Sequence, residues 1–210
     1  MEPRWTITKS GYVKVNVHGC YSSNAMRNGN KTGVEVVLRD DKGRIINMLS
    51  GTQPGLTKGR NELFAILVGL RMAFEQKKDF VLLETDNWHA YEGYHGKFSE
   101  ECQYELNQLK TRTSNPNMHV EVTYIHQAAN KLATYLDQNG GETKEDLFQT
   151  SEPFGRVLEI CHEDMGLGPV GVKFRREKET VVGAWAASTF ASPRVTGDVQ
   201  MEEGEASRAF

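Results

Sequence analysis

Three side chains that could hold a metal ion or move a proton lie where predicted strands end or predicted helices begin. His18 follows an alternating stretch, Glu62 opens an amphipathic stretch, and Asp86 follows a short apolar run. Functional groups gather at strand ends in α/β sheets. Carboxylate oxygens suit hard cations such as magnesium, whereas imidazole suits softer ones such as zinc. The three residues are therefore candidates for one site.

Each residue also has an ordinary structural explanation. A glutamate in the first turn of a helix interacts favourably with the helix dipole. An aspartate after a strand commonly caps the next helix. A histidine at a strand end can simply be packed or solvated. Taken singly, none of the three indicates a function, so the order of the surrounding elements has to decide.

The N-terminal part of the chain has the pattern of three strands joined by short loops. Residues 12–20 alternate, with Val13, Val15 and Val17 on one face, which predicts a half-buried strand. Residues 33–39 and 44–49 predict a hairpin around a turn at 40–43.

From residue 61 the apolar spacing changes from two to three and four, which predicts an amphipathic helix. The following segments are predicted as a buried strand (80–83), a short helix (87–94), a helix (100–109), a strand (120–125) and a final helix (128–136). A strand meander followed by crossovers implies an α/β fold with a five-stranded mixed sheet and helices on both faces.

The remainder of the chain differs from this pattern. Residues 138–153 are polar and predict a linker, and residues 154–182 predict a small extension made of a helix, ending near Gly166, and a strand-like segment. Residues 183–210 predict a disordered tail. Apolar residues in the extension, such as Val157 and Ile160, fit either packing on the preceding domain or docking to a partner.

Composition excludes some classes of protein. No apolar run is long enough to span a bilayer, and residues 1–10 lack a signal-peptide core. The three cysteines are distant in sequence, which suits a reducing compartment, so an intracellular protein of the cytoplasm or nucleus is expected. Residues 1–137 carry 17 Lys and Arg against 15 Asp and Glu. This near balance permits nucleic-acid binding without predicting it.

The order of five stretches resembles the ribonuclease H family, particularly the reverse-transcriptase-like ribonuclease H domains of plants. The stretches are Val13-Lys14-Val15-Asn16-Val17-His18-Gly19, Gly33-Val34-Glu35-Val36-Val37-Leu38-Arg39-Asp40, Asn61-Glu62-Leu63-Phe64-Ala65-Ile66-Leu67-Val68-Gly69-Leu70, Glu84-Thr85-Asp86-Asn87 and Ala129-Asn130-Lys131-Leu132-Ala133-Thr134. The resemblance implies a ribonuclease-H-like domain over residues 1–137, with sheet order 3-2-1-4-5.

The resemblance also implies a site of four acids that holds two magnesium ions for hydrolysis of the RNA strand of an RNA–DNA hybrid. Glu62 and Asp86 occupy the second and third positions, whereas His18 and Thr134 replace the first and fourth acids. A neutral imidazole is a poor ligand for magnesium. We therefore expect an impaired or inactive enzyme, with at best a weak magnesium site at Glu62 and Asp86. Asp137, one helical turn after Thr134, is a possible substitute.

Other residues are assigned by the same resemblance. The nucleic-acid surface is expected at Gly19, Cys20, Ser22, Lys58, Asn87 and Trp88. Binding is expected to be weak. The bacterial form has a basic protrusion in this region, whereas residues 91–109 contain Lys97 as their only Lys or Arg. A zinc site made from His18, Cys20, His89 and His95 lacks compact ligand spacing.

Three functional hypotheses follow from this sequence. The first is a non-catalytic ribonuclease-H-like module that binds an RNA–DNA hybrid or RNA, or a protein partner. The second is an active magnesium-dependent hybrid ribonuclease with an altered site. The third is a protein-interaction module with a vestigial cleft. None of them involves a membrane.

Overall fold

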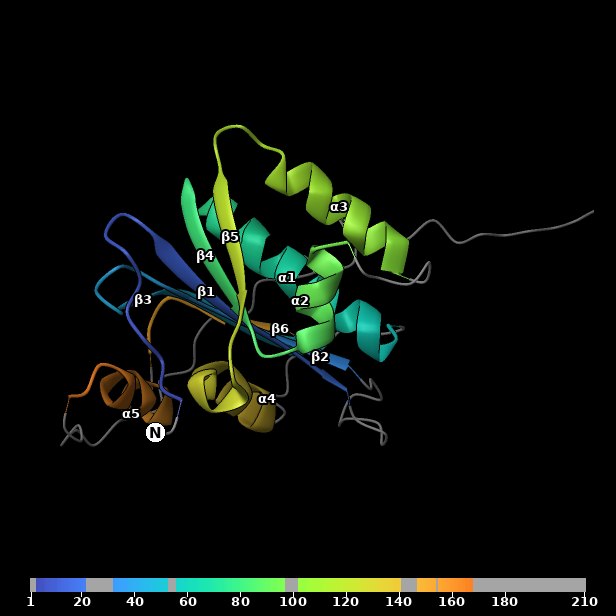
Figure 1. The fold of residues 1–210 in the computed structure, drawn as a ribbon. Coiled ribbons are helices and arrows are strands. Elements are labelled where there is room, and N and C mark those ends of the chain that lie inside the picture. The colour runs from blue at the N-terminus through green and yellow to red at the C-terminus, as the bar shows by residue number, and fades with distance from the viewer. Residues whose placement is uncertain are drawn as a thin grey trace, which may run out of the picture.

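The computed structural model describes residues 3–21, 32–52, 56–96, 102–140, 147–153 and 155–167 (Figure 1). The strands are β1 Val13–Tyr21, β2 Thr32–Arg39, β3 Ile45–Thr52, β4 Phe80–Thr85, β5 His119–Tyr124 and β6 Leu147–Thr150. The helices are α1 Lys58–Glu75, α2 Trp88–Tyr94, α3 Gln103–Thr113, α4 Lys131–Gly140, preceded by a 3-10 turn at Gln127–Ala129, and α5 Gly155–Asp164.

The strands form one mixed sheet in the order β5-β4-β1-β2-β3-β6. Strand β1 is internal, antiparallel to β2 and parallel to β4, so the predicted order 3-2-1-4-5 is confirmed. The predicted count of five strands is wrong by one. Strand β6 pairs antiparallel with β3 and covers its edge. It lies within residues 138–153, which the sequence analysis assigned to a linker, because a four-residue strand in a polar stretch has too little periodicity to detect.

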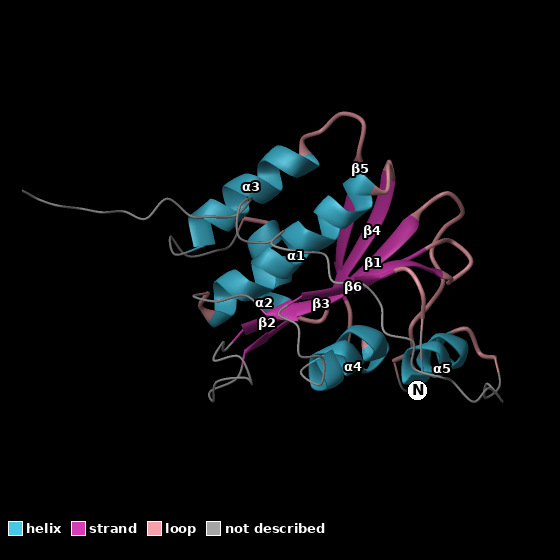
Figure 2. Ribbon diagram, turned by 180° about the vertical axis from the view of Figure 1, so that it is seen from behind, coloured by secondary structure: helices cyan, strands magenta, loops and turns pink. Residues whose placement is uncertain are grey.

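Helices cover both faces of the sheet, as predicted: α1, α2 and α3 lie on one side, and α4 and α5 on the other (Figure 2). On the first side Val15 and Val17 of β1 face α1. A Cβ atom at Gly69 of α1 would lie 2.8 Å from a methyl carbon of each valine. Glycine at this position therefore lets the helix approach the sheet closely.

The second face of β1 is buried as well, which corrects the expectation of a half-buried strand. Lys14 is 1% exposed and its Nζ lies 2.6 Å from Oε1 of Glu84. Asn16 is 2% exposed and accepts a hydrogen bond from the indole of Trp5 at 2.9 Å. Polar residues at alternating positions suggested a solvated face, but here they are buried because other polar groups satisfy them.

Helix α5 is a layer of this domain. Its residues Val157 and Ile160 are buried against Leu132 and Leu136 of α4, so this part of the extension packs on its own domain. The helix was predicted at 154–165, and Gly166 follows it with a φ of +69°, the left-handed conformation that favours glycine after a helix. The strand-like segment 170–182 and the tail 183–210 lie outside the described residues. No described helix is long and apolar enough to cross a membrane.

Candidate functional site

The end of β1 brings together the two acids that the sequence analysis carried over. Oδ1 of Asp86 lies 3.0 Å from Nδ1 of His18. Oε2 of Glu62 accepts a hydrogen bond from the backbone N–H of Gly19 at 3.1 Å. A Cβ atom at Gly19 would lie 2.9 Å from Cα of Glu62, so glycine is needed for α1 to come so close to β1. Glu62 and Asp86 therefore meet at two adjacent residues of the central strand.

Two asparagine side chains fix the helices that carry the site to the sheet. Asn61 donates to the carbonyl oxygens of Cys20 and Gly33 at 2.9 and 2.7 Å, which holds the start of α1 against β1 and β2. Asn130 donates to the carbonyl oxygen of Val17 at 3.0 Å, which holds the start of α4 against β1. The sequence elements around the site are therefore tied together by buried polar groups as well as by apolar packing.

On α4, Asp137, which the sequence analysis named as a possible substitute for Thr134, lies near His18. Its Oδ2 lies 3.8 Å from Nε2 of His18. Thr134, one turn earlier, has a buried Oγ1 that makes no hydrogen bond to any described residue. Helix α4 therefore brings the acid Asp137 to the end of β1. At the position where the family resemblance implies an acid, it has only the hydroxyl of Thr134.

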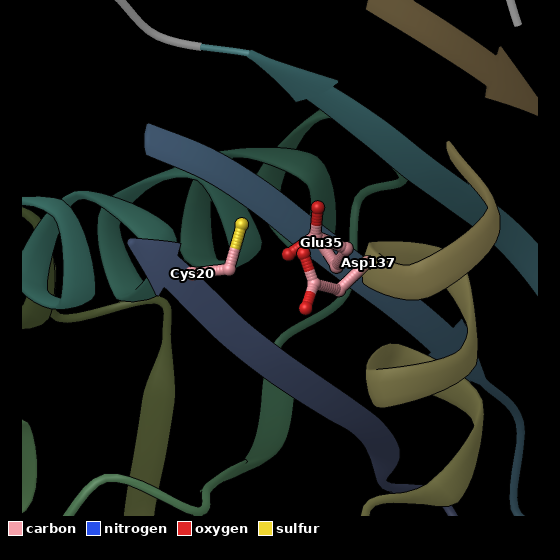
Figure 3. Close-up of side chains that lie close together, drawn as sticks. All are labelled: Cys20, Glu35 and Asp137. Atoms are coloured by element: carbon pink, nitrogen blue, oxygen red, sulfur yellow. The ribbon is translucent and has the colours of Figure 1, made fainter. Parts of the chain in front are cut away.

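Glu35 is a further acid of this region that the sequence analysis did not select. It lies in the middle of β2, directly opposite His18 in the antiparallel register. It is only 3% exposed, and its Oε2 has no hydrogen-bond partner among the described residues. Figure 3 shows Glu35 beside Cys20 and Asp137. One atom from each of these three side chains lies within 4.8 Å of the other two. A glutamate among the valines of a buried hairpin strand was the available signal.

The site raises the pKa of its own acids. Burial is the main cause that raises the pKa of Glu35 well above its usual range, and the charges of Asp137, Glu62 and Asp86 add to it. Burial likewise raises the pKa of Glu62 to about 7. For His18, burial lowers the pKa, but the hydrogen bond and charge of Asp86, with Glu62 and Asp137, raise it above the ordinary value overall. The imidazolium is thus the cation that the surrounding carboxylates stabilise.

This donor set does not fit a pair of magnesium ions. Magnesium takes oxygen ligands in octahedral geometry. Oδ1 of Asp86 is already in contact with Nδ1 of His18. Oε2 of Glu62 accepts a hydrogen bond from the backbone N–H of Gly19. At the other expected position Thr134 contributes only a neutral hydroxyl. Oδ2 of Asp86 has no hydrogen-bond partner among the described residues, so it could make one contact to a cation, but this does not make up for the two acids that His18 and Thr134 replace.

The residues expected to contact nucleic acid differ in how much of their surface is exposed. Trp88 is 50% exposed, and its ring lies 5.3 Å from the rings of both Tyr91 and Tyr124. Lys58 is exposed at the first position of α1. Asn87 caps α2 by accepting from the N–H of Ala90 at 2.9 Å. Trp88 and Tyr124 thus present aromatic surface beside Asp86.

The other expected positions offer less surface. Gly19 and Cys20 are buried, and Ser22 lies outside the described residues. The four residues that the sequence analysis named for a zinc site and found too widely spaced do not form one compact group among the described residues. In the described part of the chain, the compact group of metal-binding side chains is Cys20, Glu35 and Asp137. His89 is exposed on α2, and His95 is exposed directly after the end of that helix.

Replacing Glu62 by glutamine should make the metal-free protein relatively more stable as the pH rises. The carboxyl has an unfolded pKa of about 4.3 and a folded pKa of about 7. The folded state therefore binds more protons than the unfolded state in this interval, and stability is lost as the pH rises. The full difference is roughly 4 kcal/mol at 1.36 kcal/mol per pKa unit. About 2.5 kcal/mol of it should be lost between pH 5 and pH 7.5. Urea unfolding in a chelator at pH 5 and pH 7.5 measures it.

Two neighbouring groups act in the same direction. Glu35 and His18 also have raised pKa values, so their contributions to stability are likewise lost as the pH rises. The Glu62→Gln variant removes only the contribution of Glu62. A stability difference between variant and wild type that does not change from pH 5 to pH 7.5 would contradict the burial argument for Glu62.

Comparison with known proteins gives a consistent picture of the fold. A family model described as reverse transcriptase-like matches residues 16–139. The ribonuclease H1 of Halobacterium salinarum NRC-1 superposes with a TM-score of 0.53 at 19% identity, over 60% of this chain and 93% of that one. The N-terminal ribonuclease H domain of Rv2228c from Mycobacterium tuberculosis gives 0.54 at 15% identity, over 62% and 94%.

A third solved structure is LC11-RNase H1, a protein isolated from compost, in complex with an RNA/DNA hybrid. It superposes with a TM-score of 0.50 at 16% identity, over 59% of this chain and 92% of that one. No curated protein sequence matches the chain. At these identities the superpositions establish the shared fold, whereas the residues at the site have to be considered individually.

Proposed function

The chain belongs to the reverse transcriptase-like family of ribonuclease-H-like domains, and we propose that it binds nucleic acid of the RNA–DNA hybrid type without hydrolysing it. The observation that carries the proposal is the contact between Nδ1 of His18 and Oδ1 of Asp86 at 3.0 Å. The imidazole occupies a carboxylate oxygen that would otherwise be open to a divalent cation, and the carboxylates around it favour its protonated form, which offsets their charge.

The charge balance supports the loss of magnesium-dependent chemistry. Glu62 is half protonated near pH 7, because burial raises its pKa to about 7. Burial also favours the neutral form of Glu35, whose pKa is raised well above its usual range. His18, whose pKa the hydrogen bond and charge of Asp86 raise, lies against Asp86 and Asp137. The negative charge near His18 is therefore much smaller than the charge that a pair of divalent cations needs.

Nucleic-acid binding does not require those cations. Single bases stack on aromatic rings, and phosphates attract exposed basic side chains. Trp88 and Tyr124 are exposed beside the site and Lys58 is exposed at the start of α1. One structural neighbour, LC11-RNase H1, was solved with an RNA/DNA hybrid, which supports this class of ligand for the shared fold. The modest number of basic groups predicts weak, salt-sensitive binding.

Substitution of Trp88 by alanine should weaken the binding of a labelled hybrid with an unpaired RNA overhang by about tenfold, because stacking of an unpaired base on an aromatic ring contributes roughly 1–3 kcal/mol. Fluorescence anisotropy at low ionic strength measures the dissociation constants. Phe74→Ala is a matched control, since Phe74 is 56% exposed at the far end of α1. An equal effect of both substitutions, or no binding of hybrid, duplex or single-stranded RNA by the wild type, would count against the proposal.

A further inference from the structure

The group of Cys20, Glu35 and Asp137 has the composition of a binding site for a softer divalent cation. Cys20 and His18 are two residues apart on β1 and so face the same side of the sheet. Both lie near Asp137 of α4. Glu35 lies opposite His18 on β2 and faces that side too. Asp137 approaches from α4, and Figure 3 shows the three side chains converging between the helix and the sheet.

We propose that Cys20, Glu35 and Asp137, with His18 as the fourth ligand, bind one zinc-type divalent cation. One thiolate, two carboxylates and one imidazole are ligands that zinc accepts in tetrahedral sites, with bonds of about 2.0–2.3 Å. The ligand atoms of Cys20, Glu35 and Asp137 lie within 4.8 Å of one another, so small inward shifts bring them to one ion. His18 is not one of this compact group of three, and its Nε2 lies 3.8 Å from Oδ2 of Asp137.

The buried carboxyl of Glu35 is an independent observation that points to a bound cation. Glu35 is 3% exposed, and its Oε2 makes no hydrogen bond to a described residue. Burying such a group without a partner is unfavourable. A cation at this point satisfies the oxygen and offsets the repulsion between Glu35 and Asp137. The space beside the sulfur is preserved by Gly33, because a Cβ atom there would lie 2.6 Å from Sγ of Cys20.

Asp86 would act as a positioning residue for this site. Metal-binding histidines commonly donate their second ring N–H to a carboxylate, which fixes the tautomer and the ring orientation. Nδ1 of His18 lies 3.0 Å from Oδ1 of Asp86, so the proton belongs on Nδ1 and the lone pair of Nε2 points away from Asp86. The ring nitrogen on the Asp137 side is therefore the one that can bind a metal ion.

The ligand chemistry separates zinc from magnesium. Magnesium binds oxygen and disfavours sulfur and imidazole, whereas zinc accepts all three donors. A thiolate and two carboxylates carry three negative charges, and a zinc ion reduces this total to one. The ion would join β1, β2 and α4, so we expect it to stabilise the fold. This proposal does not depend on nucleic-acid binding, because it involves only residues within the chain.

Cobalt(II) titration of the chelator-treated full-length protein tests the proposal. We expect binding of one cobalt ion with a thiolate-to-cobalt charge-transfer absorption, which added zinc abolishes and added magnesium does not. Cys20→Ser should remove the charge-transfer band. Cys161→Ser should retain it, because Cys161 is a buried cysteine in the α5 core. Asp86→Asn should keep the band and weaken binding by about 10–100-fold.

Circular dichroism establishes that each variant is folded, and Cys20→Ala replaces Cys20→Ser if the serine variant is not. Glu35→Gln should weaken cobalt binding at least as much as Asp86→Asn. Zinc should also raise the thermal midpoint of the wild type and leave that of the Cys20 variant unchanged. Absence of a charge-transfer band at excess cobalt, or persistence of the same band without Cys20, would overturn the proposal.

Discussion

The wild-type protein is expected to leave the RNA strand of an RNA–DNA hybrid intact in magnesium or manganese, whereas the His18→Asp, Thr134→Asp double variant is expected to cleave it. The double change restores acids at the first and fourth positions that the family resemblance implies and removes the imidazole bonded to Asp86. Removal of one preorganised stabilising group typically costs roughly 10²–10³ in rate. Two restored carboxylates should therefore raise cleavage by at least about 10²-fold above the wild type.

A gel assay with a labelled RNA strand measures this rate, and Asp86→Asn placed in the double variant is the matched control. It should return cleavage to the wild-type level if the gain comes from the restored site. Cleavage by the wild type that Asp86→Asn abolishes would contradict the expectation. It would mean that Glu35 and Asp137, the two acids near His18, complete a working site in place of the missing ones.

The strand order and the meeting of Glu62 with Asp86 could be predicted from the sequence because both depend on strong local patterns. The valines of β1, the apolar run of β4 and the three-four spacing of α1 each specify one element. Once β1 and β4 are parallel neighbours, the end of β4 and the start of α1 necessarily approach the end of β1.

Other features depend on tertiary contacts that have no local pattern. Lys14 looks solvent-facing in an alternating strand, but Glu84 is 70 positions away and neutralises it. Glu35 looks like the polar residue of an ordinary hairpin, but it is buried on the face of β2 where Asp137 of α4 approaches. Asp137 was noted as a substitute for Thr134, yet its approach to His18 depends on where α4 sits. The alternation of polar and apolar residues along a strand does not indicate which of its polar residues are buried.

Asparagine in place of Asp164 is expected to lower the free energy of unfolding by about 3–5 kcal/mol, because it leaves a buried arginine without its counter-charge. Nη1 of Arg39 lies 2.8 Å from Oδ2 of Asp164, and the two side chains are only 1% and 5% exposed. The guanidinium also stacks 4.3 Å from the ring centre of Trp5. This contact ties α5 to β2 and the N-terminal segment.

Burial raises the pKa of Asp164 despite the opposing charge of Arg39, so the attraction does not fully offset the loss of hydration. Replacing both partners by apolar residues, Arg39→Met with Asp164→Leu, should therefore restore most of the stability that Asp164→Asn loses. Urea unfolding measures the three proteins at one pH.

Glu159→Gln, which breaks an exposed pair with Arg156 on the same helix, serves as the control and should cost less than about 1 kcal/mol. Equal losses for Asp164→Asn and Glu159→Gln would mean that α5 is not held to the sheet by this ion pair. A large loss at Asp164 alone would make α5 an integral layer of the domain, since the charge it neutralises lies inside the sheet at the end of β2.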